Sequence, residues 1–328
     1  LALLDHSEFA LYAIELDLRE RFPGLSPVPL LRDVRGRAEL DAVIAAERPE
    51  IVFHAAALKH LPMVEANPLE GVITNIIGTR NIAEAARAFG VPLLVMISTD
   101  KAVNPTSVMG ATKRVAEAFC QALDLYEARR RGPLEHGTRL VTVRFGNVLG
   151  STGSVVPLFQ RQLAAGGPLT VTHPEVTRFF MTVREAVELV LQAAALAPSA
   201  NQAEARGKIF VLDMGEPVRI VDLAHQMIRL AGLRPGRDIT IELIGLRPGE
   251  KLHEELFHPA EPLVATANPA IRLAAPRTAD YAMLARSIDE LEENARARRE
   301  ERVLQLVERL VPEYRRIAAG PNAATAAS

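Results

Sequence analysis

The sequence has one cysteine, Cys120, among its 328 residues, which excludes a disulfide within the chain and favours a reducing compartment. Its formal net charge is −2 and it contains no long basic run, so nucleic acid is not an indicated partner. No apolar run approaches the ~20 residues of a membrane-spanning helix, and no signal peptide is recognised at the start. These absences predict a cytoplasmic globular protein with a sizeable core.

The sequence also lacks the glycine-rich G-x-G-x-x-G turn that opens a dinucleotide-binding unit. In such a unit, an acidic residue that binds the adenosine ribose follows ~20 residues later, at the end of the second strand. Asp5, which closes the apolar run Leu1–Leu4, fits that role. We therefore interpret the sequence as lacking a first strand, turn and helix of roughly 30 residues. The alternative is that Asp5 is an ordinary carboxylate at the start of a helix.

The first half alternates short apolar runs with amphipathic segments, which indicates βαβ units around a parallel sheet. Strands are predicted at Leu1–Leu4, Val28–Leu31, Ile51–His54, Leu93–Ile97 and Leu140–Arg144. Helices are predicted at Ser7–Arg21, Gly36–Glu47, Pro68–Phe89 and Met109–Arg131. The predicted fold class is an α/β, Rossmann-like doubly wound parallel sheet that is truncated at its amino terminus.

From Asn147 onward the sequence is richer in glycine and its apolar pieces are shorter, which favours a smaller α+β lobe over the carboxyl edge of the sheet. We predict four regions along the chain. They are a dinucleotide-binding domain (1–146), a substrate lobe with segments that return to the sheet (147–290), a carboxyl-terminal helix (291–319) and a disordered tail (320–328).

The most informative stretch of the sequence follows the apolar run Leu93–Ile97. That context places Thr99, Asp100 and Lys101 at the carboxyl end of a buried strand, where open α/β sheets bind their ligands. An acid and a base side by side favour a reaction centre, and a solvent-exposed ion pair is the alternative.

Neighbouring strands also end in residues suited to a cofactor. Asp33 and Val34 close one strand, and a carboxylate there can accept a hydrogen bond from an adenine amino group. Ala55 and Ala56 follow another strand and let the backbone approach a flat ligand. Each signal is weak alone, but all fall at the same edge of the predicted sheet.

Together these residues resemble the extended short-chain dehydrogenase/reductases and, more narrowly, the UDP-N-acetylglucosamine 4,6-dehydratases of capsule, O-antigen and flagellin-glycan synthesis. The similarity runs from Asp5 to about Leu256. It is carried by H-A-A-A-L-K-H at 54–60, Asn75, S-T-D-K-A at 98–102, M-G-x-x-K at 109–113, R-F-G-N-V-L-G at 144–150, T-R-F-F at 177–180 and R-P-G-E-K at 247–251.

The resemblance implies that the sugar 4-hydroxyl is oxidised by hydride transfer to NAD(P)+, that water then leaves across C5 and C6, and that the hydride returns to C6. Lys101 would be the base at C5, Asp100 the acid for the C6 hydroxyl, and Thr99 a hydrogen-bond partner of the 4-oxygen. Lys113 would bind the nicotinamide ribose. To act, Lys101 must be neutral and Asp100 protonated, and we expect a partly dry cleft to favour this neutral pair.

The resemblance also assigns ligand-binding residues. Those expected for the cofactor are Asp5, Asp33, Val34, Ala55, Ala56, Lys59, Asn75, Ser98 and Lys113. Those expected for a UDP-N-acetylhexosamine are Lys59, Asn147, Val148, Thr172, Arg178, Arg247 and Glu250. The two arginines are the expected diphosphate partners, with structural ion pairing as the alternative. The cofactor is NAD or NADP, and the Asp5 carboxylate favours NAD. No metal site is predicted.

Met109 departs from the usual pattern, because most short-chain reductases carry a Tyr four residues before the Lys to remove the hydroxyl proton. A thioether cannot accept that proton. Either the chain belongs to a Met-containing subgroup in which Lys101, Lys113 or a water takes the proton, or it is impaired. A 4- or 5-epimerase, which shares the ketone intermediate, and an inactive sugar-nucleotide-binding or assembly module therefore stay open. Simple 4-epimerisation does not need the Asp100–Lys101 pair.

The resemblance further implies a homo-oligomer that pairs through helices such as Pro68–Phe89 and Met109–Arg131. Family members with this Met often carry amino-terminal membrane helices. In a longer parent chain we therefore expect an inner-membrane anchor, with this part in the cytoplasm.

Overall fold

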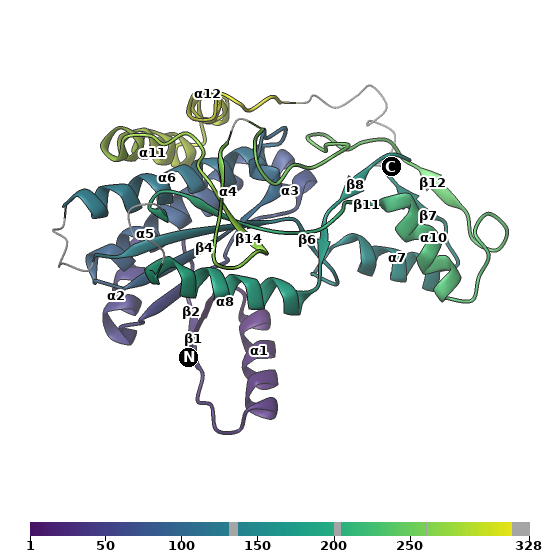
Figure 1. Cartoon of the computed structure of the whole chain (residues 1–328), viewed down its shortest axis with the longest axis horizontal. Helices are drawn as coiled ribbons and strands as arrows, with labels where there is room; N and C mark the ends of the chain where they lie inside the picture. The colour runs from purple at the N-terminus through teal and green to yellow at the C-terminus, as the bar shows by residue number, and fades with distance from the viewer. Residues whose placement is uncertain (131–136, 200–204, 260, 317–328) are drawn as a thin grey trace.

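The computed structural model describes residues 1–130, 137–199, 205–259 and 261–316. Its centre is a six-stranded sheet with helices on both faces, and a smaller lobe lies to one side (Figure 1). The predicted disordered tail, 320–328, lies outside the described residues.

The six-stranded sheet has the order β13-β14-β10-β5-β4-β3. Its parallel strands are β3 (Ile51–His54), β4 (Leu93–Thr99), β5 (Arg139–Phe145) and β10 (Ile209–Leu212). An antiparallel edge is added by β14 (Ile271–Ala274) and β13 (Leu263–Ala265). The predicted parallel sheet is confirmed, and segments from the second half of the chain return to it as β10, β13 and β14.

Helices cover both faces of this sheet (Figure 1). On one face lie α2 (Arg37–Glu47), α5 (Gly78–Ala88), α6 (Val108–Arg130), α11 (Tyr281–Arg296) and α12 (Glu300–Leu310). The other face is covered by α8 (Val183–Ser199). Because both faces are covered, β4 begins with a continuous buried apolar run rather than an alternating pattern.

Side chains of β4 alternate between two apolar cores. Leu94 and Met96 pack with the core that includes α5 and α6, whereas Leu93 and Val95 pack with the core under α8. The same alternation directs Ser98, near the end of the strand, toward α6, where its hydroxyl donates a hydrogen bond to Glu117.

The two amino-terminal strands are separate from this sheet. β1 (Ala2–Asp5) and β2 (Val28–Leu31) pair in parallel with each other, and neither is hydrogen-bonded to β3. The outer edge of β3 has no partner strand among the described residues, and its Ile51 and Phe53 side chains are partly exposed. The parallel sheet predicted for the first half is therefore split between β1 and β3.

Two predicted helical segments are interrupted. Residues 68–89 form α4 (Pro68–Val72), a π-helical turn η1 (Ile73–Ile77) and α5. Within the carboxyl-terminal helix predicted over 291–319, α11 ends at Arg296 and α12 begins at Glu300, and residues 317–319 lie outside the described residues. Between them Arg298 has φ +59°, a left-handed conformation that ends the first helix.

The amino-terminal helix is capped by a side chain. α1 (Glu8–Arg21) begins after Ser7, whose hydroxyl accepts a hydrogen bond from the Ala10 amide at 3.3 Å. Ser7 therefore satisfies one of the free amides of the first turn.

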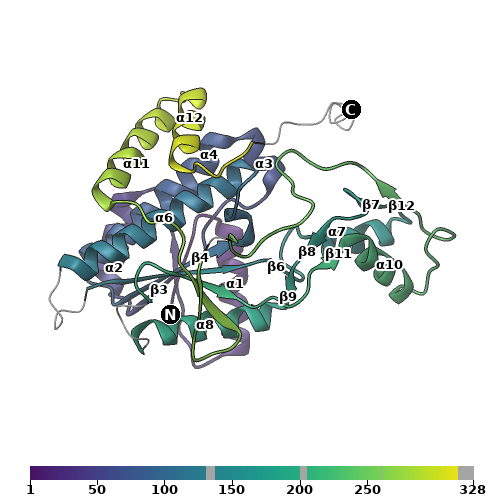
Figure 2. The ribbon, with the colours of Figure 1, turned by 45° about the horizontal axis from the view of Figure 1, so that its top comes forward.

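The smaller lobe has its own apolar core around Phe159, Leu169 and Ile228. Its helices are α7 (Val155–Ala164) and α10 (Ile220–Leu230), whereas α3 (Leu61–Ala66) packs into the core of the main domain through Val64. Its short strands are β6 (Asn147–Val148), β7 (Leu169–Val171), β8 (Thr177–Arg178), β9 (Phe180–Met181), β11 (Val218–Arg219) and β12 (Ile241–Leu243). Figure 2 shows this lobe beside the main sheet, joined to it through β6 and β9.

Both helices expected to pair protomers are covered from within the chain. The rings of Phe119 on α6 and Tyr281 on α11 have centroids 6.0 Å apart. Arg80 on α5 contacts Asp289 on α11 at 2.7 Å. Since most residues of α6 are buried, the structure contradicts pairing through that helix, whereas the oligomeric state itself stays a prediction.

Within the described ranges, no helix combines the length and the apolar character that crossing a bilayer requires.

Substitution of Gly110 by Ala tests how closely α6 approaches the turn after β4. A Cβ atom there would lie 2.2 Å from the Lys101 carbonyl oxygen, so the backbone would have to shift. We expect the Gly110→Ala variant to lose about 1–3 kcal/mol of unfolding free energy in urea denaturation. Gly24→Ala is the control, because nothing lies within 4 Å of its Cβ position. Equal stability of the two variants would contradict the close approach.

Candidate active site at the end of strand β4

The residues that follow β4 form a tight polar turn. Residues Asp100–Ala102 make a single 3-10 turn, η2, and the Thr99 hydroxyl accepts a hydrogen bond from the Lys101 amide at 3.4 Å. Because β4 and β5 are parallel neighbours, Asn147, just after β5, comes to the same edge of the sheet. The predicted position of this turn, at the carboxyl end of a buried strand, is confirmed.

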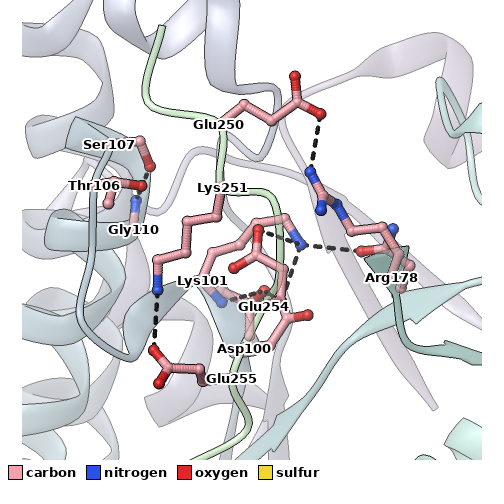
Figure 3. A network of polar contacts seen from close by, with 12 residues as sticks. Asp100, Lys101, Thr106, Ser107, Gly110, Arg178, Glu250, Lys251, Glu254 and Glu255 are labelled. Carbon is pink, nitrogen blue, oxygen red and sulfur yellow. Dashed lines mark hydrogen bonds and ion pairs between the residues drawn. The ribbon is translucent and has the colours of Figure 1, made fainter. Parts of the chain in front are cut away.

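The Lys101 ammonium is surrounded by three oxygen atoms (Figure 3). It donates to Asp100 Oδ1 at 2.9 Å and to Asn147 Oδ1 at 3.0 Å, and Glu254 Oε1 lies 3.9 Å away. Thr99 Oγ1 also donates to Asp100 Oδ1, at 2.9 Å. The structure therefore brings together five polar side chains, of which all but Glu254 were predicted.

Glu254 is the residue that sequence reasoning missed. It lies in a run of charged residues, 250–255, that gives no periodic signal of burial. Its side chain is nevertheless only 2% exposed, because the segment passes over the end of β4.

The Asp100–Lys101 pair is not solvent-exposed, since the Asp100 side chain is fully buried and that of Lys101 is 17% exposed. Burial lowers the pKa of Lys101, but the carboxylates of Asp100 and Glu254 outweigh burial and raise that pKa above its usual value. The two carboxylates therefore favour the ammonium form of Lys101, and the neutral pair expected for catalysis stays a prediction.

Lys113 and Met109 lie one turn apart on α6. The Lys113 amino group donates to the carbonyl of Ile97 at 2.8 Å, and burial lowers its pKa to about 8 against the opposing effect of Glu117. Met109 is 2% exposed and belongs to the apolar core. Its thioether supplies no proton acceptor, and its part in a reaction stays a prediction.

A buried ion pair lies directly beneath this site. The Arg144 guanidinium donates to both Glu117 carboxylate oxygens, at 3.0 and 2.7 Å, and Ser98 Oγ donates to the same carboxylate at 2.7 Å. The pair joins the ends of β4 and β5 to α6. Sequence reasoning missed Glu117 as well, and it placed Ser98 at the cofactor, whereas the Ser98 hydroxyl is used inside the protein.

A cavity of about 380 Å³ opens at the carboxyl ends of β1, β2 and β3. The predicted cofactor residues that line it are Asp5, Asp33, Val34, Ala55 and Ala56. The Asp5 carboxylate accepts from the amide of Ser7 at 2.7 Å, and the side chain of Arg35 donates to Asp33, also at 2.7 Å. The alanines keep one wall free of bulky side chains, so the structure gathers these five residues around one space.

The remaining predicted cofactor residues, Lys59, Asn75, Ser98 and Lys113, do not line this cavity. The Asn75 side chain binds both backbone groups of Leu58, at 2.8 and 3.0 Å, and so fixes the loop after β3. Lys59 is exposed, and partial burial together with the charge of Lys101 lowers its pKa.

Predicted substrate residues gather in the second lobe around one carboxylate. Glu250 Oε1 accepts from Arg178 at 2.9 Å and from Thr172 at 3.1 Å, and Oε2 accepts from the Arg247 amide at 3.2 Å. Arg178 is buried, whereas Arg247 is exposed. Val148 forms part of the short β6–β9 pairing that joins the two lobes. No group of three or more candidate metal ligands occurs in the described part of the chain.

The parallel sheet, the cavity at its carboxyl edge and the polar turn after β4 define a Rossmann-like α/β fold of the extended short-chain dehydrogenase/reductase type. The chain belongs to the polysaccharide biosynthesis protein family, whose model matches residues 1–276.

Particular relatives agree with this assignment. The chain is 50% identical over 260 residues to the capsular polysaccharide biosynthesis protein CapD of Staphylococcus aureus, a match that covers 79% of this chain and 41% of CapD. It thus spans less than half the length of that relative.

Among solved structures, Pen from Bacillus thuringiensis is similar with a TM-score of 0.72 and 34% identity, covering 83% of this chain and 78% of Pen. DesIV, a dTDP-glucose 4,6-dehydratase from Streptomyces venezuelae with NAD and DAU bound, shares the fold with a TM-score of 0.62 and 19% identity, over 78% of each chain.

The buried Glu117–Arg144 pair predicts a strong effect on stability. For Glu117, burial raises the carboxyl pKa, but Arg144 outweighs burial and holds the pKa below its usual value. Replacing Glu117 by Gln removes the bidentate partner of the buried Arg144 guanidinium and leaves it the longer contact with Glu261 at 3.5 Å, which we expect to cost about 3–5 kcal/mol of unfolding free energy at pH 7, measured in urea.

The pH dependence has a defined sign. A lowered folded-state pKa stabilises the protein above the unfolded pKa of about 4.3, and that stabilisation is lost as the pH falls through the folded value. The difference between wild type and Glu117→Gln should therefore shrink in acid. The exposed pair Arg184–Glu188 supplies the control, and Glu188→Gln should change stability by less than about 0.5 kcal/mol. A deficit that did not depend on pH would argue against an ionised Glu117.

Proposed function

We propose that this chain is the catalytic part of a sugar-nucleotide 4,6-dehydratase that converts a UDP-N-acetylhexosamine to its 4-keto-6-deoxy derivative for capsule, O-antigen or other glycan synthesis. The observation that carries the proposal is the buried Thr99–Asp100–Lys101 turn at the carboxyl end of β4, with acid and base in contact at 2.9 Å. The match to the polysaccharide biosynthesis family and the fold shared with DesIV support it.

In this proposal Lys101 takes the proton from C5 and Asp100 gives a proton to the C6 hydroxyl. The resting pair is an ammonium and a carboxylate in contact at 2.9 Å, so Lys101 must first lose a proton and Asp100 must first gain one. Thr99 holds the 4-oxygen.

The residues around the β1–β3 cavity fit a nicotinamide dinucleotide. The alanine wall would leave room for a flat adenosine, Asp5 would offer an acceptor to the ribose hydroxyls, and Asp33 with Val34 would border the adenine. A bound nicotinamide would supply the hydride chemistry at C4 and C6. Lys113 would bind its ribose, Asn75 would hold the adjoining loop, and Ser98 would contribute through its backbone. An acidic Asp5 favours NAD over NADP.

We also propose that a further strand followed by a glycine-rich turn belongs between β1 and β3. The ends of β1 and β3 line the same cavity, yet the two strands are not hydrogen-bonded to each other. A strand there would pair the open edge of β3, and its turn would bring backbone amides to the cofactor pyrophosphate.

The sugar nucleotide would lie between the two lobes. Asn147 and Val148 would border the sugar, while Lys59, Thr172 and the two arginines would approach the diphosphate. Arg178 is bound to Glu250 at 2.9 Å in this structure, so a diphosphate would have to share or replace that contact. A homo-oligomer and a membrane-anchored longer parent chain remain parts of this proposal.

One observation favours a second candidate, an inactive sugar-nucleotide-binding module. Met109, at the position of the expected phenol, is buried in the apolar core and cannot accept a proton. Turnover separates the two candidates, because only the dehydratase loses water from its substrate.

The deciding experiment supplies UDP-N-acetylglucosamine and NAD to the chain expressed with its upstream coding region. We expect mass spectrometry to detect a product lighter by one water. Asp100→Asn should lower the rate about 100-fold or more, because the C6 hydroxyl then lacks its acid. Asp17→Asn is the control, since Asp17 pairs with Arg21 on the exposed face of α1.

Other products would count against the dehydratase. A product of unchanged mass with inverted configuration would favour an epimerase. Binding of the sugar nucleotide without any product would favour the inactive module.

The role of position 109 is tested by Met109→Tyr. Because Met109 packs in the core rather than against the Lys101 site, we expect the pH profile of kcat to stay in place, whatever the cost in stability. Met283→Tyr on the exposed side of α11 controls for the added ring. A faster variant with a shifted pH profile would show that this position can carry the hydroxyl proton.

A further inference from the structure

Glu254 stands beside the Asp100–Lys101 pair without taking part in any of the roles assigned above (Figure 3). Its Oε1 lies 3.9 Å from the Lys101 ammonium, and its Oε2 is buried with no hydrogen-bond partner. Asp100 Oδ2 is likewise buried and without a partner. Two carboxylates therefore face one ammonium, and each has a buried oxygen that accepts no hydrogen bond from the protein.

The cations around Glu254 are largely engaged with other groups. Arg178 contacts Glu250 at 2.9 Å, and Lys251 donates to the Val103 carbonyl at 2.7 Å and contacts Glu255 at 3.5 Å. Among the cations in the described part of the chain, Lys101 is the one that forms an ion pair with the Glu254 carboxylate, at 3.9 Å. A buried carboxylate with an unsatisfied oxygen is costly, and taking up a proton relieves that cost.

The electrostatics of Glu254 agree with this geometry. Burial and the Asp100 carboxylate raise its pKa, and the opposing charges of Lys101, Arg178 and Lys251 do not cancel that effect. A carboxyl group with a raised pKa accepts a proton from a neighbouring ammonium more readily than an exposed one does.

We propose that Glu254 stores a proton for this site: it takes the proton of Lys101 when a substrate proton enters the cluster and returns it at the end of turnover. The proposal rests on the dehydratase function. It gives Glu254 a role that acts through Lys101, not through direct contact with the sugar.

Every proton in the reaction is accounted for when Glu254 holds one of them. Oxidation of C4 sends a hydride to the nicotinamide and the hydroxyl proton to the Asp100 carboxylate. Lys101 then passes its proton to Glu254 and becomes an amine. That amine takes the C5 proton while Asp100 protonates the C6 oxygen, so the C6–O bond breaks, the C5–C6 double bond forms and water leaves.

The second half restores the starting charges. The hydride adds to C6, and Lys101 gives its new proton to C5. Glu254 then returns the stored proton to Lys101. Without an acceptor for the Lys101 proton, the arrival of the hydroxyl proton on Asp100 would leave acid and base both protonated, and nothing could remove the C5 proton.

The test uses Glu254→Gln, which keeps the shape of the side chain and removes its ability to store a proton. The neighbouring Glu255 supplies a matched control, because it is more exposed and is bound by Lys251 and Asn104. Urea denaturation establishes that both glutamine variants are folded.

The first measurement is an infrared pH titration of the cofactor-free chain. We expect the wild type and Glu255→Gln to have a carboxyl C=O band that persists above the usual pH range of glutamate, and Glu254→Gln to lack it. If no band depends on Glu254, the proposal is overturned. This readout requires no turnover.

The second measurement is the pH profile of kcat for the chain with its upstream region. We expect Glu254→Gln to lower kcat about 100-fold and to move the profile, with KM little changed, and Glu254→Asp to recover part of the rate. An unchanged kcat and profile would also overturn the proposal. If the wild type itself forms no product, the proposed function fails, and the infrared titration still decides whether Glu254 holds a proton.

Discussion

The bidentate contact between Glu117 and Arg144 is the interaction on which the candidate site depends. It joins three elements, since Arg144 lies on β5, Glu117 on α6, and Ser98 on β4 donates to the same carboxylate. The strand residues Ser98 and Arg144 come shortly before Thr99, Asp100, Lys101 and Asn147 of the candidate site. Breaking a buried ion pair is costly, because it leaves an unpaired charge in the protein interior. The pair therefore holds the ends of β4 and β5 in a fixed position relative to α6.

Because these elements are fixed relative to one another, three charged side chains can be held together at the end of β4. Asp100, Lys101 and Glu254 come from two distant parts of the sequence and meet where the second lobe crosses the end of β4. The glycine at 146 has a role here, because a Cβ atom would lie 3.1 Å from Asp100 Oδ2 and 2.9 Å from the Phe179 Cβ. The backbone that follows β5 can thus approach the Asp100 carboxylate closely and helps to bury its inner oxygen.

Much of the framework could be predicted from the sequence, because parallel strands buried on both faces produce continuous apolar runs, as in Leu93–Ile97. The turn after β4 followed from the same run. Glu117 and Glu254 could not be predicted, since a buried charge is visible only through its partner, which lies far away in sequence. The sequence also did not predict that β1 and β2 form a sheet separate from β3. A local pattern predicts strands but not which of them are hydrogen-bonded neighbours.

Because Met109 is buried and its thioether accepts no proton, the proposed reaction needs a proton acceptor elsewhere in the site. If α6 contributes a thioether where a phenol is usual, any proton released from a substrate hydroxyl must be received at the end of β4. A single Asp–Lys pair has one acceptor for it and then no free base. A third ionisable group beside Lys101 removes that conflict, and Glu254 is the carboxylate that lies within 3.9 Å of the ammonium. In the proposed mechanism, the thioether on α6 accepts no proton. The additional buried carboxylate of the second lobe, Glu254, therefore supplies the acceptor that the proton balance requires.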